Sequence, residues 1–201
     1  NTGGMGAYAP APVLTEALKD KCMATIIGPV LKALETEGRP YSGCLYAGLM
    51  IKGDSIKVVE FNARFGDPET QAVLPLLDGD LAEIMLACAT GTLKPEMVKW
   101  SNKAAVCVVM ASGGYPGSYA KNMAITGLQE ANNLPDVVVF QAGTKEANGQ
   151  VVTNGGRVLG VTAVSDTIAN AKEKAYAAVE RIHFENAHYR TDIAWRALRR
   201  K

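Results

Sequence analysis

The sequence contains few histidines, no paired cysteine motif and no long apolar run. Its two histidines, His183 and His188, lie away from any grouping of Ser, Cys and Asp that would predict a catalytic triad. The four cysteines are widely spaced among apolar residues, which argues against a zinc site and favours buried, reduced thiols in a cytoplasmic setting. They are Cys22, Cys44, Cys88 and Cys107.

An excess of charge of one sign is also lacking. The 21 Lys and Arg residues balance 20 Asp and Glu residues, for a net charge of +1, which argues against a general nucleic-acid binder. Small anionic substrates need only a few local cations and stay possible. No segment approaches the roughly 18–20 apolar residues that cross a bilayer, and no basic segment followed by an apolar run predicts a secretory signal. We therefore expect neither nucleic acid nor membrane as a partner.

What the chain does have is an ordinary globular composition, with 48% hydrophobic and 20% charged residues over 201 positions. This length suits one large domain or two small ones. The sequence begins without Met inside a glycine-rich motif, Asn1-Thr-Gly-Gly-Met-Gly6. Motifs seldom sit at a true terminus, where the backbone frays, so we expect that sequence upstream has been lost by truncation or processing.

Apolar residues at helical spacing predict a helix over Val13–Glu37, starting at Thr15 or Pro12, ending before Gly38 and kinked or split at Gly28-Pro29. Two strand-like runs, Cys44–Ile51 and Ser55–Phe65, flank a short turn and predict an antiparallel hairpin. The further predicted helices are Glu69–Leu77, Leu81–Thr90 and Ala169–Ile182, and the further predicted strands are Ala104–Ala111, Val137–Ala142 and Val158–Val164. The tail His183–Leu198 is expected to pack on the sheet.

Because these strands and helices do not alternate cleanly, the order favours an α+β fold over a doubly wound parallel sheet. The polar segment Gly91–Asn102, which contains Pro95, separates helical patterns before it from strand-like runs with glycine-rich turns after it. We place a domain boundary there, between residues 1–95 and residues 96–201.

The segment Val58–Glu69 carries the residues most suggestive of chemistry. Side chains alternate faces along a strand, so Glu60, Asn62 and Arg64 should share one face. Oxygen donors from Glu60 and Asn62 suit Mg²⁺, and Arg64 could neutralise charge on a transferring phosphoryl group. A solvated strand face with a weak Glu–Arg pair explains the same spacing. The spacing alone leaves both interpretations open.

The run Glu60-Phe-Asn-Ala-Arg-Phe-Gly-Asp-Pro-Glu69 resembles the metal-binding strand of glycinamide ribonucleotide synthetases, a family of ATP-grasp ligases. The resemblance implies that Glu60 and Asn62 are Mg²⁺ or Mn²⁺ ligands at the ATP site. It places Arg64 as a catalytic and substrate-binding residue facing the phosphates or an acyl phosphate. Asp67, as a catalytic residue, and Glu69, as a substrate-binding residue, fall where the family has acidic side chains beside the substrate.

The glycine-rich start of the chain adds a second similarity to the same family. Glycine-rich loops let backbone N–H groups approach an anion, although most such loops are simply turns. In the resembling family this stretch lies beside the glycine and phosphoribosylamine sites. The resemblance therefore implies substrate-binding roles for the residues Thr2, Gly3, Gly4 and Gly6.

Three downstream segments extend the resemblance over the rest of the chain: Met110–Gly117, Asn154–Leu159 and Phe184–Ile193. The first is equally well explained as a turn between strands. In the second, glycines flank Arg157, which we expect to contact a ribose phosphate or the nucleotide. In the third, Arg190 and Asp192 are expected to form a structural pair rather than to bind a ligand.

The resemblance implies the second half of an ATP-grasp domain, an antiparallel sheet with helices, followed by a small C-terminal α+β domain. It implies an ATP-dependent ligase of purine synthesis that joins glycine to 5-phosphoribosylamine through glycyl phosphate, releasing ADP and phosphate. The N-terminal half of such an enzyme would be missing here, so this chain alone should be inactive. Two alternatives stay open: another ATP-grasp ligase or carboxylase built on the Glu-x-Asn-x-Arg strand, and a non-catalytic binding module.

Overall fold

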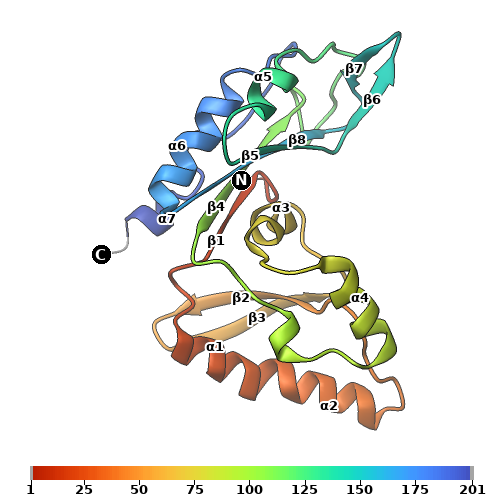
Figure 1. The fold of residues 1–201 in the computed structure, drawn as a ribbon, viewed down its shortest axis with the longest axis vertical. Helices are drawn as coiled ribbons and strands as arrows, with labels where there is room; N and C mark the ends of the chain where they lie inside the picture. The colour runs from red at the N-terminus through yellow and green to blue at the C-terminus, as the bar shows by residue number, and fades with distance from the viewer. Residues whose placement is uncertain (1, 200–201) are drawn as a thin grey trace. The chain divides into compact units, whose positions relative to one another are not determined.

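The computed structural model describes residues 2–199, which divide into two compact units (Figure 1). The large unit comprises Asn1–Pro10, Asp67–Leu76 and Ser101–Lys201, and the small unit comprises Ala11–Gly66 and Leu77–Trp100. Compactness alone defines these units, and the domain boundary predicted near residue 95 stays a prediction. Mixed helices and antiparallel sheets confirm the α+β prediction.

The large unit is built on a four-stranded antiparallel sheet in the order β1-β4-β8-β5. The strands are β1 (Gly6–Ala9), β4 (Ala104–Ala111), β8 (Arg157–Ser165) and β5 (Val137–Gln141). The sequence predicted β4, β8 and β5 within a residue or two of their bounds. It missed β1, because four residues that begin with glycine carry no strand-like apolar pattern.

Strand β4 is buried along its whole length, which explains why it lacks polar alternation. One set of its side chains joins the main apolar core together with small residues of α6 (Ile168–Val179); this set is Val106, Val108 and Met110. The alternate set packs with Met5 and with Ala72 of α3 (Glu69–Val73); this set is Cys107, Val109 and Ala111. The sheet of the large unit is therefore covered on both faces.

The other elements of the large unit are short: η2 (Leu74–Leu76), α5 (Leu128–Asn132), β6 (Thr144–Ala147), β7 (Gln150–Thr153) and α7 (Trp195–Leu198). The hairpin β6–β7 and helix α5 were not predicted. Bridges from Ala111 to His188 and from Thr126 to His183 confirm that the tail packs on the body of the unit.

The first part of the small unit is one unbroken helical run that changes its winding: α1 (Glu16–Cys22), the π-helical η1 (Met23–Ile27) and α2 (Gly28–Thr36). The Thr15 side chain caps α1 by accepting a hydrogen bond from the Leu18 amide, as predicted. Pro29 sits in the first turn of α2, so the predicted disturbance appears as the π-helical turn before it. Gly38 follows the last turn with φ of +73°, as expected for a C-cap glycine.

The second part of the small unit is the predicted hairpin, β2 (Tyr46–Lys52) and β3 (Ser55–Asn62), together with α4 (Leu81–Thr90) and η3 (Pro95–Met97). Helix α4 has the predicted bounds. Asp80 caps its start and Gly91, in the left-handed conformation, ends it. In the described part of the chain, no helix has both the length and the apolar character needed to cross a membrane.

The four cysteines are free thiols, as their apolar sequence surroundings predicted. Cys22 and Cys107 are buried, whereas Cys44 and Cys88 are half-buried, so the prediction of burial was right for only two of them. Burial raises the pKa of Cys107 to about 11, which keeps this thiol neutral at physiological pH.

Candidate functional site

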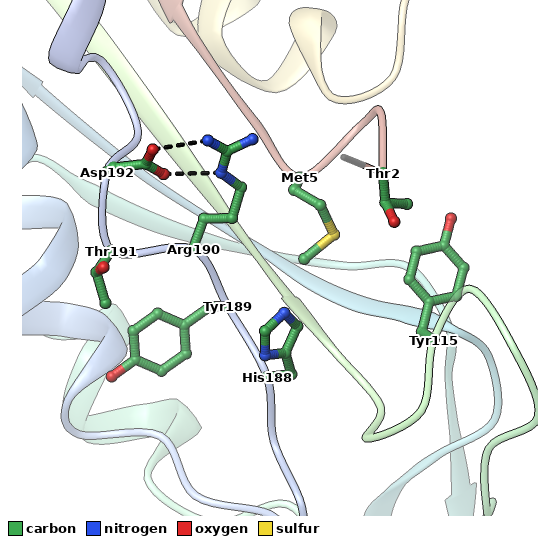
Figure 2. Close-up of a pocket in the computed structure, with 8 residues that line it drawn as sticks. All are labelled: Thr2, Met5, Tyr115, His188, Tyr189, Arg190, Thr191 and Asp192. Atoms are coloured by element: carbon green, nitrogen blue, oxygen red, sulfur yellow. Dashed lines mark hydrogen bonds and ion pairs between the residues drawn. The ribbon is translucent and has the colours of Figure 1, made fainter.

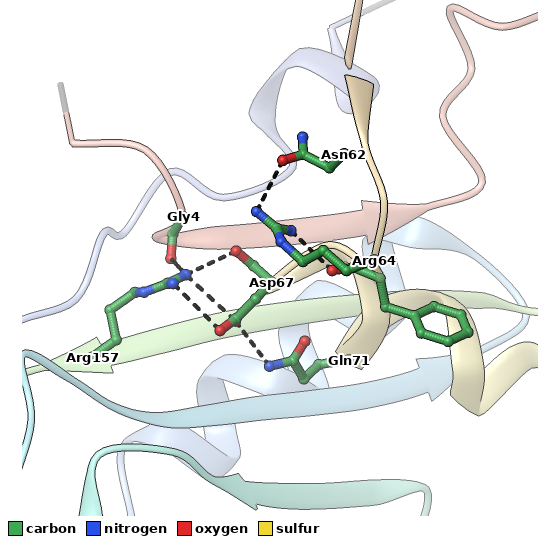
Figure 3. Close-up of polar contacts among 7 residues, drawn as sticks. Gly4, Asn62, Arg64, Asp67, Gln71 and Arg157 are labelled. Carbon is green, nitrogen blue, oxygen red and sulfur yellow. Dashed lines mark hydrogen bonds and ion pairs between the residues drawn. The ribbon is translucent and has the colours of Figure 1, made fainter. Parts of the chain in front are cut away.

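The end of β3 in the small unit and the bend after it bring together the acid, the amide and the cation that the sequence placed on one face. The predicted strand was too long, since β3 ends at Asn62 and Arg64 lies two residues beyond it. The Asn62 Nδ2 group donates to Glu60 Oε1 at 3.0 Å. The Arg64 guanidinium donates to Asn62 Oδ1 at 3.3 Å and to the Phe65 carbonyl at 2.9 Å (Figure 3). Glu60 is exposed to solvent. The three side chains thus form a short polar row that is accessible to a ligand.

A close backbone approach on β2 supports the position of Glu60. Gly48 pairs with Glu60, and the register then shifts between Gly48 and Leu49, which leaves Val59 as the bulged residue. A Cβ atom added at Gly48 would lie 3.1 Å from Glu60 Cγ. Gly48 was not predicted as a site residue, because its only signal was a glycine inside an otherwise apolar strand pattern.

The donor set on β3 fits a divalent metal that takes most of its ligands from elsewhere. Carboxylate and amide oxygens are hard donors of the kind that Mg²⁺ and Mn²⁺ accept. A half-turn of the Asn62 amide, which breaks its hydrogen bond from Arg64, would bring its oxygen beside the Glu60 carboxylate. Among residues 2–199, no group of three or more His, Cys, Asp or Glu side chains could hold a metal. Water and nucleotide phosphates would complete the coordination.

A second polar cluster lies wholly within the large unit and centres on Asp67. Arg157 Nη1 donates to the Asp67 carbonyl at 2.8 Å and to the Gly4 carbonyl at 3.2 Å (Figure 3). The same guanidinium contacts both carboxylate oxygens of Asp67, at 3.4 and 3.3 Å. Gln71 Nε2 donates to Asp67 Oδ1 at 3.0 Å. Asp67 is thus held by two side chains, one from β8 and one from α3.

The glycines of the N-terminal loop differ in how tightly they are packed. Gly4 has φ of +74°, and a Cβ atom there would lie 2.5 Å from Arg157 Nη1. A Cβ atom at Gly6 would lie 2.7 Å from the Cys107 carbonyl oxygen, because β1 pairs closely with β4. A Cβ atom at Gly3 would meet nothing within 4 Å. Packing therefore accounts for Gly4 and Gly6 but not for Gly3.

Two pockets of the large unit border this loop. One, of about 380 Å³, is lined by Thr2, Met5, Tyr115 and the segment from His188 to Asp192 (Figure 2). The other, of about 760 Å³, is lined by Thr2, Gly3, Gly6 and Glu69, together with Arg190, Asp192 and neighbours in the C-terminal tail. The larger pocket therefore gathers four of the residues that the sequence assigned to substrate binding.

The wall that both pockets share contains the Arg190–Asp192 ion pair. Its two hydrogen bonds, from Nε and Nη2 to the two carboxylate oxygens, are each 2.7 Å long (Figure 2). The Arg190 hydrogen bond holds the pKa of Asp192 below its usual range, so the carboxylate stays ionised. The predicted structural pairing is confirmed. The place of this pair in the pocket wall was not predicted, since no local pattern links residues 190–192 to residues 2–6.

The fold resembles that of carboxylating enzymes over nearly the whole chain. The biotin carboxylase subunit of pyruvate carboxylase superposes with a TM-score of 0.63 over 92% of this chain and 40% of that one, at 17% identity. At that identity the likeness concerns the fold alone. The class follows from a sequence match instead, because residues 1–70 match an ATP-grasp domain, which makes this chain an ATP-grasp protein.

Sequence comparison narrows the class to one family. Residues 1–70 match the ATP-grasp (A) domain of phosphoribosylglycinamide synthetase, and residues 105–196 match the C domain of the same protein. The chain therefore belongs to the phosphoribosylglycinamide synthetase family.

Named relatives agree with this assignment. A chloroplastic phosphoribosylamine–glycine ligase from Arabidopsis thaliana is 51% identical over all of this chain and 38% of its own length. One from Escherichia coli O157:H7 is 49% identical over 47% of its length. The Thermotoga maritima phosphoribosylamine–glycine ligase structure superposes with a TM-score of 0.84 at 36% identity, over 96% of this chain and 47% of that one. The chain spans about half the length of these relatives, or less.

Proposed function

We propose that this chain forms the C-terminal part of an ATP-dependent ligase that joins glycine to 5-phosphoribosylamine in purine synthesis. The observation that carries the proposal is the Glu60-Asn62-Arg64 row, in which hydrogen bonds link a carboxylate and an amide at the end of β3 with a cation just beyond it. It occurs in a chain whose relatives are named for this reaction. The activity belongs to a longer protein, since the chain corresponds to about half of those relatives. We place that protein in the cytoplasm.

In this proposal Glu60 and Asn62 would hold Mg²⁺ or Mn²⁺, which neutralises the negative charge of the ATP phosphates when bound. Arg64 stabilises charge that develops on the phosphoryl oxygens. The glycine carboxylate attacks the γ-phosphorus of ATP, which forms glycyl phosphate and releases ADP. The amine of phosphoribosylamine then attacks the glycyl carbonyl, which forms the amide and releases phosphate. No enzyme nucleophile is required, so the residues of the chain act by positioning and by neutralising charge.

The larger pocket is the proposed place for substrate contacts from the N-terminal loop. Thr2, Gly3 and Gly6 line it together with Glu69, which supports the substrate-binding roles assigned to them. Gly4 lies in the same loop and faces Arg157 rather than the pocket lining. Asp67, which Arg157 and Gln71 hold in place, would act beside the substrate as a hydrogen-bond acceptor.

The test is an ADP-release assay on the complete protein that contains this chain, with glycine and phosphoribosylamine supplied separately and together. Release that needs both substrates and a divalent metal supports the proposal. Release with a different acid–amine pair would keep an ATP-grasp ligase but change its substrates. No release from the folded complete protein would favour a non-catalytic module.

The variant Glu60→Gln tests the metal row directly. Loss of one anionic ligand should lower turnover on the order of a hundredfold or more, while the thermal unfolding midpoint stays close to that of the unaltered protein. Glu37→Gln, at another exposed glutamate of the small unit, is the matched control and should keep full turnover. Undiminished turnover in Glu60→Gln would remove Glu60 from the metal site.

A further inference from the structure

One guanidinium in the large unit connects three segments that are distant in sequence. Arg157 begins β8, Gly4 lies in the N-terminal loop and Asp67 precedes α3. Arg157 Nη1 donates to the carbonyls of Gly4 and Asp67, and Nη2 donates to Asp67 Oδ2 (Figure 3). The side chain of Arg157 is 29% exposed. The guanidinium is thus partly shielded from water, and its hydrogen bonds to protein groups contribute more stability than the same bonds would at a fully exposed surface.

Both partners of Arg157 are shaped to receive it. At Gly4 the backbone has φ of +74°, and any Cβ atom would lie 2.5 Å from Arg157 Nη1, so only glycine leaves room for the guanidinium. At Asp67 the carboxylate is fixed from the other side by Gln71 Nε2 at 3.0 Å. The other amide atom, Gln71 Oε1, is buried without a hydrogen-bond partner in the described structure. The unpaired Oε1 atom of Gln71 is energetically unfavourable, whereas the Nε2 atom of the same amide fixes Asp67.

These contacts lie beside the larger pocket. The N-terminal loop lines that pocket through Thr2, Gly3 and Gly6, and the start of α3 lines it through Glu69. Gly4 is within the loop, and Asp67 is two residues before Glu69. The Arg157 hydrogen bonds therefore set the separation of two segments that form the pocket.

We propose that Arg157 is a positioning residue, which fixes the glycine-rich loop against the Asp67–Glu69 segment and so sets the shape of the substrate pocket. The inference deepens the proposed function and rests on it for the identity of the substrate. It differs from the sequence-based expectation that Arg157 binds a ribose or nucleotide phosphate directly. Lysine retains the charge, but its donors sit on a single nitrogen, so it cannot reproduce the contact of two guanidinium nitrogens with the two carboxylate oxygens of Asp67.

The first experiment is amide hydrogen exchange on the complete protein, comparing Arg157→Lys with the unaltered protein. Exchange in the peptide that covers residues 2–9 should rise at least about tenfold in the variant, since hydrogen bonds to charged groups contribute on that scale. Gly4→Ala should raise it similarly, because its Cβ atom displaces the guanidinium. Arg181→Lys, at an exposed arginine of the same unit, is the control and should leave this peptide unchanged. Unchanged exchange in Arg157→Lys would overturn the proposal.

The second experiment is a double-mutant cycle in the ligase assay with Arg157→Lys and Asp67→Asn. If Arg157 acts through Asp67 and the loop, each single variant lowers kcat/KM about tenfold and the double variant is little worse than the poorer single variant. If Arg157 instead binds a phosphate directly, the two losses multiply and the KM for phosphoribosylamine rises with kcat unchanged. That second outcome would overturn the proposal. Absence of any ligase activity in the unaltered protein would reject the proposed function, while hydrogen exchange would still decide the role of Arg157.

Discussion

The two units of this protein differ in how they are stabilised. Both apolar core clusters of the described residues lie in the large unit, where β4 is buried on both faces. In the small unit the buried apolar side chains among the described residues are Leu18, Cys22 and Ala87. Its hairpin and α4 leave large apolar side chains exposed, such as Met50 at 64%, Val59 at 65% and Leu86 at 65%.

The proposed metal-binding strand β3 therefore lies outside the best-packed part of the chain. The Glu60-Asn62-Arg64 row belongs to the small unit. Several large apolar side chains of this unit are not covered by other residues of the chain. The chain amounts to 47% of the length of the Escherichia coli relative. We therefore expect the large unit to be stable by itself and the small unit to gain stability in the complete protein.

The largest expected effect is a difference in amide hydrogen exchange within this chain. The slowest amides of β4 and β8 should exchange at least about a hundredfold more slowly than those of β2 and β3, because local opening of a poorly packed hairpin costs little. Exchange followed by mass spectrometry on the isolated chain measures this ratio. Equal protection in the two units would contradict this expectation, since it would show that the small unit is as stable as the large one.

Two leucine truncations measure how much a buried side chain of the large unit and an exposed side chain of the small unit each contribute to stability. Leu159→Ala removes a side chain that is 1% exposed in the main core and should cost about 2–5 kcal/mol of the free energy of unfolding. Leu86→Ala, at an exposed leucine of α4, should change it by no more than about 0.5 kcal/mol. Urea denaturation followed through the exchange of β4 amides gives the value for Leu159→Ala, and the exchange of α4 amides gives the value for Leu86→Ala. A comparable loss from Leu86→Ala would mean that the surface of α4 is already covered in this chain.

A substitution on β2 asks whether the small unit holds Glu60 rigidly. Gly48→Ala places a Cβ atom 3.1 Å from Glu60 Cγ, and the displaced carboxylate should lower turnover of the complete protein roughly tenfold. Met50→Ala, at an exposed residue of the same strand, is the control and should leave turnover intact. If Gly48→Ala keeps full turnover, the hairpin adapts easily and the row tolerates movement.

The smallest expected effect concerns the surface of the large unit. A hydrogen bond from Lys174, at 2.8 Å, holds the pKa of Asp136 below its usual range. A depressed folded-state pKa gives stability that is present above the unfolded pKa, near 3.9, and is lost as pH falls through the folded pKa. The thermal midpoints of the unaltered protein and Asp136→Asn should therefore differ slightly at pH 7 and converge in acid. A constant difference across this range would exclude the Lys174 interaction as its cause.

Much of the fold could be predicted because its patterns are local. The apolar run of β4 and the capped helix α4 can each be recognised from consecutive residues, and their predicted bounds were correct. Strand β1 escaped prediction because its strand conformation depends on pairing with β4, about a hundred residues away. The hairpin β6–β7 escaped because its residues are too polar to give a strand pattern.

The site was predictable to the extent that its residues are neighbours in sequence. Strand alternation predicts Glu60 and Asn62 on one face, whereas Arg64, which lies beyond the end of β3, joins them through its hydrogen bond to Asn62. The contacts of Arg157 with Gly4 and Asp67 could not be predicted, because they join segments 153 and 90 residues apart. Gly48 was missed because a steric requirement becomes visible only when the partner strand is in place.

The pairing of β1 with β4 has a consequence for how this protein can be divided. Residues 6–9 fall in the segment that matches the ATP-grasp domain, yet they form an edge of the sheet whose other strands match the C domain. A C domain produced from residue 96 onward would expose the backbone N–H and C=O groups of β4 and invite aggregation. A chimaera that exchanges this domain between relatives should therefore include residues 2–10 of the same relative. This strand could be joined to the domain in one chain or added as a separate peptide.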